Sequence, residues 1–531
     1  MRAAPVVLAF LLALVAAGSA PAAGTPPRLL GLSISNGGRP FAGDTRELAT
    51  VSPNGDGLRD HAIVRFRLDR SGTVELQAVA TDETRRPPVL VWHTRRSFGA
   101  GRHTIQWTPK RTIPARTYLL RFVVRGRDGS TRVYGFENPQ PHRLTTGLVV
   151  RILGVEAAFL RPSYLQGGPA KVSIATDSPT IHIQVFSYAA AGTRDPNTNA
   201  VAVTPPVRLS WRGHRNAPHV VDVRPSGTWP SGLYFLRVTT KDGHVGYAPL
   251  ILRPRILGEH RVAVVIPTNT WQAYNFTDAN GDGWGDSWYI GGATRAIDLR
   301  RPYVEPGLPY RFRDWSAPVS SWLRETGKAA DYLSDDDLAS VKTGGDLRAA
   351  YDLVVFSGHE EYVTDHVYDV VERYRDLGGN LMFLSANNFF WKVRREGRRL
   401  RRIQMWRRLG RPEAGLVGVQ FVAGNCCIAE KTYVVQAASS EPWVFAGTGL
   451  GNGSSFGRGG IEVDARAPSS PSNVVVLARI PQAIGNHDAE MTLYRAASGA
   501  RVFAAGSLDF TASIGSPAVS RLVDNVWARL S

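Results

Sequence analysis

The sequence predicts a protein of several domains, in which two β-sandwiches precede an α/β domain built on an open parallel sheet. Three observations support this fold class. The chain has 531 residues, which is too long for one ordinary hydrophobic core. Short stretches of alternating apolar and polar residues fill its first half. After about residue 256 they give way to continuous apolar runs that alternate with helical patterns.

The two sandwiches are expected over residues 24–145 and 146–255. Their short alternating strands, such as "GTVELQAVA" and "GLYFLRVTT", are separated by Gly, Asp and Pro. The two regions also share an internal repeat. Pro114–Gly129 and Pro230–Gly243 each place a tyrosine early in an alternating strand and end in a turn that contains Asp-Gly. We therefore expect two copies of one sandwich type.

The α/β domain is expected over residues 256–531. "RVAVVIP", "YDLVVFSG" and "LMFLSANN" have the continuous apolar character of strands covered on both faces. Between the last two, residues 365–377 carry apolar side chains at helical spacing, and Gly378-Gly379 follows as a stop signal. A strand, a helix and a strand in this order form a βαβ unit, so the sheet should be parallel. The basic run "KVRREGRRLRRIQMWRRLGR" is expected to be a helix with an exposed basic face.

Residues 1–23 have the features of a secretory signal peptide, with an arginine, an apolar run and small residues near the cleavage position. No later segment has the pattern of a membrane span, so we expect the mature protein to be secreted or held in the cell envelope. Its two cysteines, Cys426 and Cys427, are adjacent, so the chain is not a disulfide scaffold. The formal net charge is +18, but the arginines are spread along the chain without a nucleic-acid motif, and we expect no nucleic-acid partner.

Polar and aromatic residues follow the carboxyl ends of the predicted parallel strands. "VAVVIP" runs into "TNTWQAYN", "LVVF" into "SGHEEY", "LMFL" into "SANNFFW" and "VFAAG" into "SLDF". Ligands bind at this edge of open parallel sheets. The four segments should therefore contribute to one site.

Several kinds of catalytic site do not fit these residues. The chain has no G-x-S-x-G nucleophile elbow and no cysteine at a strand-to-helix turn. A glycosidase needs two carboxylates that flank the substrate, but Glu360 and Glu361 should point in opposite directions. His366 and His487 lack metal-ligand spacing to His359. Carboxylates and phenols remain, and such hard oxygen ligands suit a hard cation such as ferric iron.

Four motifs in this order resemble the catalytic large subunit of N,N-dimethylformamidase over about residues 230–531. They are "PTNTWQAYN", "SGHEEY", "GGNLMFLSANNFFW" and "GNHDAEMTLYR". The resemblance implies a sheet like that of the glutamine amidotransferases and a small amide as substrate. In the first sandwich, "VSPNGDGLRD" resembles the opening of immunoglobulin-like domains found in flagellar hook-capping and cell-surface adhesion proteins.

The same resemblance implies a mononuclear iron held by two tyrosines and one glutamate, here Tyr234, Tyr274 and Glu361. It implies further roles for His359 beside the metal, for Glu490 as a catalytic acid or base, and for Asn387 as a contact of substrate or water. Val363 departs from the family pattern, which often has Trp at this place.

The segment "DANGDGWGD" is a candidate calcium loop. Its oxygen side chains have the early ligand spacing of such loops, with Gly283 for the tight turn and with the ligands Asp278, Asn280, Asp282 and Asp286. The twelfth position, where calcium loops have a bidentate glutamate, is Tyr289. The alternative is a plain Asp/Gly turn.

These observations predict an exported, iron-dependent amidohydrolase that cleaves a small amide C–N bond with metal-activated water. One alternative is a non-catalytic cell-envelope binding or adhesion protein, whose sandwiches contact polysaccharide or partner proteins. Another is a carbohydrate-active hydrolase that uses the same oxygen-rich site.

Overall fold

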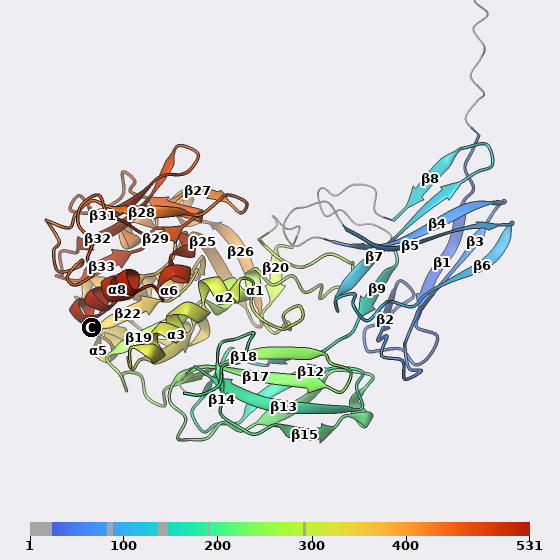
Figure 1. Ribbon diagram of the computed structural model, residues 1–531, viewed down its shortest axis with the longest axis horizontal. Coiled ribbons are helices and arrows are strands. Elements are labelled where there is room, and N and C mark those ends of the chain that lie inside the picture. Colours follow the sequence, from blue (N-terminus) through green and yellow to red (C-terminus); the bar gives the residue numbers. More distant parts are fainter. Residues whose placement is uncertain (1–23, 82–88, 136–146, 189–190, 290–293) are drawn as a thin grey trace, which may run out of the picture.

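The computed structural model describes residues 24–81, 89–135, 147–188, 191–289 and 294–531 (Figure 1). The predicted signal peptide, residues 1–23, lies outside these ranges. A first sandwich stands at one end of the molecule, and a second sandwich lies beside a larger C-terminal region. Strand residues outnumber helical residues in the described part of the chain, so this is a multidomain protein of mostly β-sheet.

Two sheets form the first sandwich. One has the strand order β1-β3-β6, with β1 (Leu29–Ser35), β3 (Ala62–Leu68) and β6 (Gly101–Trp107). The other has the order β2-β9-β7-β4-β5, with β8 beside β7. Its members are β2 (Leu48–Val51), β4 (Gly72–Ala80), β5 (Val89–Phe98), β7 (Thr117–Arg125), β8 (Thr131–Tyr134) and β9 (Val149–Ile152). Alternate residues of β3 are buried, as the sequence pattern predicts.

The second sandwich also has two sheets. The smaller has the order β10-β12-β16, with β10 (Glu156–Phe159), β12 (Ala170–Ala175) and β16 (His219–Val223). The larger has the order β11-β18-β17-β13-β14, with β15 beside β13. Its members are β11 (Ser163–Leu165), β13 (Thr180–Ser187), β14 (Val201–Ala202), β15 (Val207–Ser210), β17 (Gly232–Thr240) and β18 (Val245–Arg253).

The C-terminal region is built on a nine-stranded sheet with the order β21-β19-β22-β24-β33-β32-β31-β28-β29. The first five strands are parallel. Four of them are the predicted apolar runs, which confirms that prediction: β19 (Val262–Ile266), β22 (Leu353–Phe356), β24 (Asn380–Phe383) and β33 (Arg501–Ala504). The fifth, β21 (Asp331–Ser334), was not predicted. The other four continue the sheet with antiparallel pairing: β28 (Lys431–Val435), β29 (Ser455–Gly459), β31 (Val475–Ile484) and β32 (His487–Arg495). The sheet is therefore mixed rather than wholly parallel.

Helices cover both faces of the parallel strands. Val354 and Phe356 of β22 pack toward α6 (Asp365–Asp376), and Leu353 and Val355 pack toward α3 (Ala317–Glu325) and α8 (Pro517–Leu530). α6 begins where the Thr364 hydroxyl accepts a hydrogen bond from the Val367 N–H. The shorter helices are α1 (Thr268–Ala273), α2 (Phe312–Trp315), α4 (Asp335–Ser340), α5 (Gly344–Ala350) and α7 (Ala414–Val417). In the described ranges no helix is long and apolar enough to cross a membrane.

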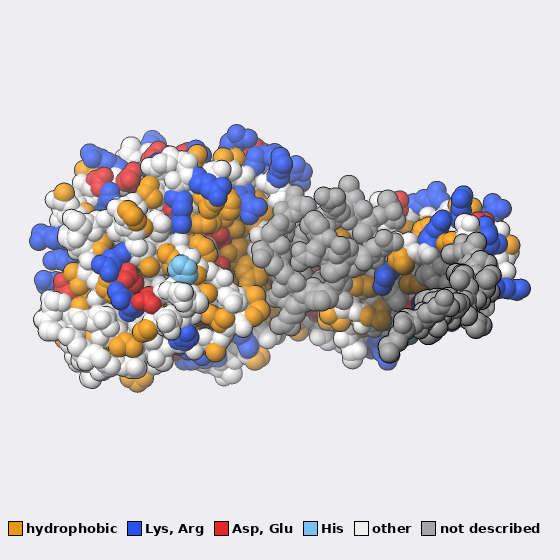
Figure 2. Space-filling model, turned by 90° about the horizontal axis from the view of Figure 1, so that it is seen from above, with side chains coloured by type: hydrophobic (Ala, Val, Ile, Leu, Met, Phe, Trp, Pro, Cys, Tyr) orange, Lys and Arg blue, Asp and Glu red, His pale blue; other side chains and the backbone are white. Residues whose placement is uncertain are grey.

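The basic run predicted to be a helix is a β-hairpin. β25 (Trp391–Glu396) pairs with β26 (Arg399–Met405) around a turn in which Gly397 has a φ of 60°. Val393 and Leu400 are buried, one in each strand, and most of the arginines are exposed. The hairpin belongs to the sheet β20-β26-β25-β23, with β20 (Ala296–Asp298) and β23 (Tyr362–Val363). Lys and Arg side chains are scattered over the face shown in Figure 2 and do not gather in one stripe.

The second sandwich and the C-terminal sheet share one hydrophobic core. Phe235 of the sandwich packs edge-on against Phe312 of α2, with 5.1 Å between ring centroids. The same cluster of buried side chains continues to Val264 and Val355 in the parallel strands. The second sandwich also has a separate core between its two sheets, which includes Trp211 and Leu236.

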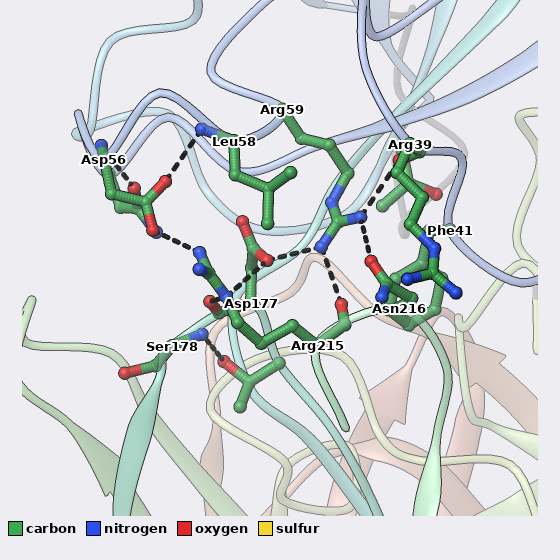
Figure 3. A network of polar contacts seen from close by, with 12 residues as sticks. Arg39, Phe41, Asp56, Leu58, Arg59, Asp177, Ser178, Arg215 and Asn216 are labelled. Atoms are coloured by element: carbon green, nitrogen blue, oxygen red, sulfur yellow. Dashed lines mark hydrogen bonds and ion pairs between the residues drawn. The ribbon is translucent and has the colours of Figure 1, made fainter. Parts of the chain in front are cut away.

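The two sandwiches meet at a buried ion pair (Figure 3). The Arg59 Nη2 atom lies 2.5 Å from the Asp177 Oδ1 atom, and neither side chain is exposed to solvent. Arg59 also donates to the Asn216 side chain at 2.9 Å. Arg215 binds both Asp177 and Asp56. Burial raises the pKa of Asp177, although the guanidinium of Arg59 opposes this.

Replacing Arg59 by Met is expected to reduce the free energy of unfolding by about 3–5 kcal/mol, because the carboxylate of Asp177 loses a partner that it cannot replace with water. Urea unfolding followed by tryptophan fluorescence measures the change. Arg65→Met is the matched control, because Arg65 is exposed and donates to the Ser35 hydroxyl, and it should cost no more than about 0.5 kcal/mol. Equal effects of the two variants would contradict the role given to the pair.

Candidate functional site

The carboxyl ends of β19, β22 and β24 carry the segments that the sequence predicts to form a site. After β19 comes α1, and Tyr274 follows directly on α1. After β22 the loop that carries His359 and Glu361 is wholly buried, and the Ser357 hydroxyl anchors it by donating to the Val265 carbonyl at 2.9 Å. The Glu361 N–H donates to the Thr270 hydroxyl of α1 at 3.1 Å. The two segments therefore hold each other in place.

Tyr274, His359 and Glu361 form a compact buried cluster. The Tyr274 hydroxyl donates to the Glu361 Oε2 atom at 2.5 Å and lies 3.0 Å from the His359 Nε2 atom. His359 Nε2 is 3.3 Å from the same Glu361 oxygen. The other ring nitrogen, Nδ1, lies 2.9 Å from the Ala386 carbonyl, to which it can only donate. Burial alone would lower the pKa of His359, but Glu462, Glu361 and the Ala386 carbonyl raise the pKa to about 9. The Nε2 atom therefore also carries a proton at neutral pH.

A second phenol reaches the same carboxylate. Tyr362 is buried, its hydroxyl is a hydrogen-bond partner of Glu361, and its ring centroid lies 6.2 Å from that of Tyr274. Burial and then the charge of Glu361 raise the pKa of both tyrosines well above its usual value. Both phenols are therefore protonated unless a cation takes the place of their protons.

Glu360 points away from this cluster, as the sequence predicts for neighbouring residues. Its carboxyl group is buried near Asp335 of α4, and burial followed by the Asp335 charge raises its pKa well above the usual range. Glu360 is therefore a neutral carboxylic acid behind the site, whereas Glu361 faces the phenols.

Glu462 is a member of the site that sequence reasoning did not identify. It lies on β30 (Ile461–Ala465), which pairs with β27 (Gln420–Asn425), and its Oε2 atom is 3.5 Å from His359 Nε2. The Asn387 side chain donates to this oxygen at 2.8 Å. Burial and the charge of Glu361 raise the pKa of Glu462 to about 7, although His359 lowers it. The available signal was the alternation "IEVD", which puts two carboxylates on an otherwise apolar strand.

Asn387 is held in an unusual backbone conformation. Its φ is 54°, in the left-handed region, and its N–H donates to Asp464 of β30 at 2.8 Å. Within the described residues the Asn387 Oδ1 atom is buried without a hydrogen-bond partner. This oxygen is free to accept a hydrogen bond from a substrate or a water molecule, while the amide nitrogen fixes Glu462.

Tyr234 is not brought to the cluster. It lies in the core of the second sandwich, where its hydroxyl donates to the Pro230 carbonyl at 2.8 Å and its ring stacks on Trp229. Tyr118 makes the same contact with the Pro114 carbonyl in the first sandwich, at 2.7 Å. The shared sequence pattern thus corresponds to a shared structural contact that closes a corner of each sandwich.

Glu490 also lies apart from the cluster. It sits on β32, where the guanidinium groups of Arg466 and Arg479 bind it at 3.0 and 2.9 Å. Burial would raise the pKa of Glu490, but the bonds from Arg466 lower it. A carboxylate held by two arginines is a poor proton acceptor, so the proton-transfer role expected for Glu490 fits Glu462 better.

The candidate calcium loop packs against the first sandwich. Its carboxylates accept hydrogen bonds from the loop itself, as when Asp278 Oδ2 accepts from the Gly283 N–H at 2.7 Å. The Asn280 and Asp282 side chains bind each other, and Asp286 accepts from the Ala279 N–H. Trp284 lies against Leu119 and Val149 of the sandwich, and the Thr81 hydroxyl donates to the Gly283 carbonyl. The loop therefore connects the C-terminal region to the first sandwich.

The donor set of the cluster fits a hard cation only if the phenols take part. In the ranges that the structure describes, His, Cys, Asp and Glu side chains form no group of three or more that could hold a metal ion. Tyr274, Tyr362 and Glu361 instead bring two phenol oxygens and a carboxylate to one point. Oxygen atoms of this kind are the donors that hard cations prefer.

A cavity of about 380 Å³ lies beside the cluster, and Tyr274 belongs to both. Aromatic rings connect the two: Tyr289 is 4.9 Å from Tyr274 and 5.0 Å from Tyr310, between ring centroids. The Trp315 ring lies 6.0 Å from His359. The cavity lining includes Asn275, Phe276, Tyr303, Glu305, Tyr310, Arg311, Arg313 and Asp314.

Comparison with known proteins gives one strong match. Residues 191–521, more than half of the chain, match the family model described as "N,N-dimethylformamidase beta subunit-like, C-terminal". No curated protein matches the chain. It resembles the solved mmIFT52 N-terminal domain with 13% identity, over 41% of this chain and 91% of that one, at a TM-score of 0.26. It resembles trypsin-activated alpha-2-macroglobulin from Escherichia coli with 8% identity, over 43% of this chain and 17% of that one, at a TM-score of 0.23. At these TM-scores neither structure informs the site.

Proposed function

The chain belongs to the family of N,N-dimethylformamidase beta subunit-like C-terminal regions, and from this membership we propose that it is an iron-dependent hydrolase of a small amide. The family indicates an amide hydrolase. The observation that carries the proposal is the convergence of Glu361, two phenols, an imidazole and the Glu462 carboxylate at one edge of the sheet. Such groups can hold a cation and move a proton within one site.

The residues that would hold iron are Tyr274, Tyr362 and Glu361. When bound, ferric iron supplies Lewis acidity toward an amide carbonyl and a water molecule. Glu361 and two phenolates would carry three negative charges, which match the charge of the ion. Tyr362 takes the place that the resemblance gives to Tyr234.

Glu462 is the proposed proton acceptor. With a pKa of about 7 it is half ionised at neutral pH, and its Oε2 atom can take a proton from the attacking water. The water oxygen bonds to the carbonyl carbon, the C–N bond breaks, and Glu462 returns the proton to the leaving amine nitrogen. The protonated Nε2 of His359 donates toward the developing oxyanion, and the Asn387 amide keeps Glu462 oriented.

The test is to purify the full-length protein, measure its metal content and visible spectrum, and assay small neutral amides alongside glycosides. We expect about one iron per chain, a tyrosinate charge-transfer band and release of amine from an amide. Iron-free, colourless protein without amidase activity would overturn the proposal and favour an envelope-binding protein. Cleavage of glycosides alone would favour a carbohydrate-active enzyme.

We also propose that the protein works outside the cytoplasm, as residues 1–23 predict. N-terminal sequencing of protein recovered from outside the cell should begin near residue 24.

The second phenol ligand can be identified by two tyrosine substitutions. Tyr362→Phe is expected to remove most of the bound iron or to shift the charge-transfer band, because one phenolate is lost. Tyr234→Phe should leave iron and colour unchanged and cost about 1 kcal/mol of stability through the lost bond to Pro230. Elemental analysis, the visible spectrum and thermal unfolding give the result, and the opposite pattern would restore Tyr234 as the ligand.

A further inference from the structure

Arg311 is a half-buried arginine that lines the cavity beside Tyr274. Its Cζ atom lies 5.5 Å from the centre of the Trp315 ring, and the Tyr310 hydroxyl is its hydrogen-bond partner. Among the ion pairs of the described residues, none includes Arg311. The Asp509 carboxylate attracts the Arg311 guanidinium from beyond ion-pair distance. The Asp509 Oδ1 atom accepts a hydrogen bond from the Trp315 indole N–H at 2.7 Å. A guanidinium group so placed has free donors for a planar anion.

The backbone at Arg311 is strained. Its φ is 49° and its ψ is 30°, which is the left-handed region, where a residue other than Gly or Asn costs about 1–2 kcal/mol. Strain of this kind is concentrated at ligand-binding sites.

The other charged groups of the cavity are occupied or lie in solvent. Glu305 is bound by His244, with 3.0 Å between the Oε1 and Nδ1 atoms. Arg313 and Asp314 are exposed, and Arg313 donates to the Asn197 carbonyl at 3.0 Å. Arg311 is thus the cation best placed to receive an anion inside the cavity.

The distance from Arg311 to the cluster limits the size of the ligand. The Trp315 ring lies 5.5 Å from the guanidinium and 6.0 Å from the His359 ring, so guanidinium and imidazole are at most about 11.5 Å apart. Interactions at the two ends take up about 4 Å each. A ligand that reaches both ends therefore has at most about three carbon–carbon bonds between its anionic group and its amide carbonyl.

We propose that Arg311 binds a carboxylate on the substrate, so that the amide hydrolysed here is a short amido-carboxylate rather than a neutral amide. This inference rests on the proposed amidase function and adds the substrate class. The aromatic wall of Tyr289, Tyr310 and Trp315 would hold the carbon chain between the two polar ends.

The test compares succinamate with butyramide, which differ only in having a carboxylate or a methyl group at the end far from the amide. The wild-type enzyme should prefer succinamate by at least about tenfold in kcat/KM, and Arg311→Gln should reduce this ratio about 30-fold, the loss typical of a charge-assisted pair. Arg313→Gln, at the same cavity, should leave the ratio within about twofold. A wild-type enzyme with no preference, or equal effects of the two variants, would overturn the proposal.

A binding measurement separates this inference from the amidase proposal. Succinate has a carboxylate at each end, one of them in place of the amide, and calorimetry reports its binding without turnover. If neither amide is hydrolysed, the amidase proposal fails, and the binding of succinate still tests whether Arg311 forms an anion site. Binding to the wild type that weakens at least about tenfold in Arg311→Gln, with unchanged circular dichroism, supports the anion site. Absence of binding to the wild type overturns it.

Discussion

Glu361→Gln is expected to lower kcat/KM for an amide by about 10³-fold or more, because the substitution removes the charge that would balance a bound cation. The amide also cannot accept the hydrogen bonds of both phenols as the carboxylate does. Iron content and the charge-transfer band should fall with the activity. Steady-state kinetics, elemental analysis and the visible spectrum measure the three effects in one preparation.

The matched control is Glu360→Gln at the neighbouring position. Because Glu360 is a neutral acid that faces Asp335, glutamine reproduces its shape and charge, and activity should stay within about threefold of the wild type. A similar loss of iron in both variants would show that the loop, and not the Glu361 carboxylate, is what matters.

Glu462→Gln is expected to lower kcat by about 10²–10⁴-fold while iron and colour remain. Its carboxylate contacts His359 and Asn387 and not the phenols, so the ligand set is preserved. This separation of metal binding from activity distinguishes Glu462 from Glu361. Loss of iron in Glu462→Gln would place Glu462 among the ligands instead.

The pH profile provides a second measurement of the same role. Burial and the charge of Glu361 raise the pKa of Glu462 to about 7, so the group is protonated below that pH and cannot accept a proton. Wild-type kcat/KM should therefore fall about tenfold per pH unit as pH drops below about 7, and the residual activity of Glu462→Gln should lack this decline. If Glu490→Gln removes the decline and Glu462→Gln does not, the base is Glu490, as the family resemblance implies.

Much of the scaffold could be predicted because burial leaves a direct trace in the sequence. Continuous apolar runs predicted the parallel strands, and the polar segments after them led to Tyr274, His359, Glu361 and Asn387. Those segments meet because parallel strands end at one edge of their sheet.

The remaining parts of the site depend on contacts that no local pattern contains. Glu462 arrives on a separate two-stranded sheet, so its place opposite His359 is set by tertiary packing. Tyr234 shows that one sequence pattern can fit two roles. A tyrosine early in an alternating strand can be a metal ligand or the hydrogen-bonded corner of a sandwich. Only the bond to the Pro230 carbonyl distinguishes the two. The basic hairpin of β25 and β26 was not predicted because each of its strands has one buried apolar residue, Val393 or Leu400, which is too few to show a period of two.

The hydrophobic cluster shared by the second sandwich and the parallel strands limits how this protein can be divided into fragments. Cutting the polypeptide at residue 256 would remove the contact of Phe235 with Phe312. The C-terminal fragment, which carries Tyr274, would then expose apolar side chains that are buried in the intact protein. Trp284 would likewise lose Leu119 and Val149. Such a fragment would tend to aggregate, so the accessory modules are integral to the folding unit, and biochemical work requires the polypeptide from about residue 24 onward.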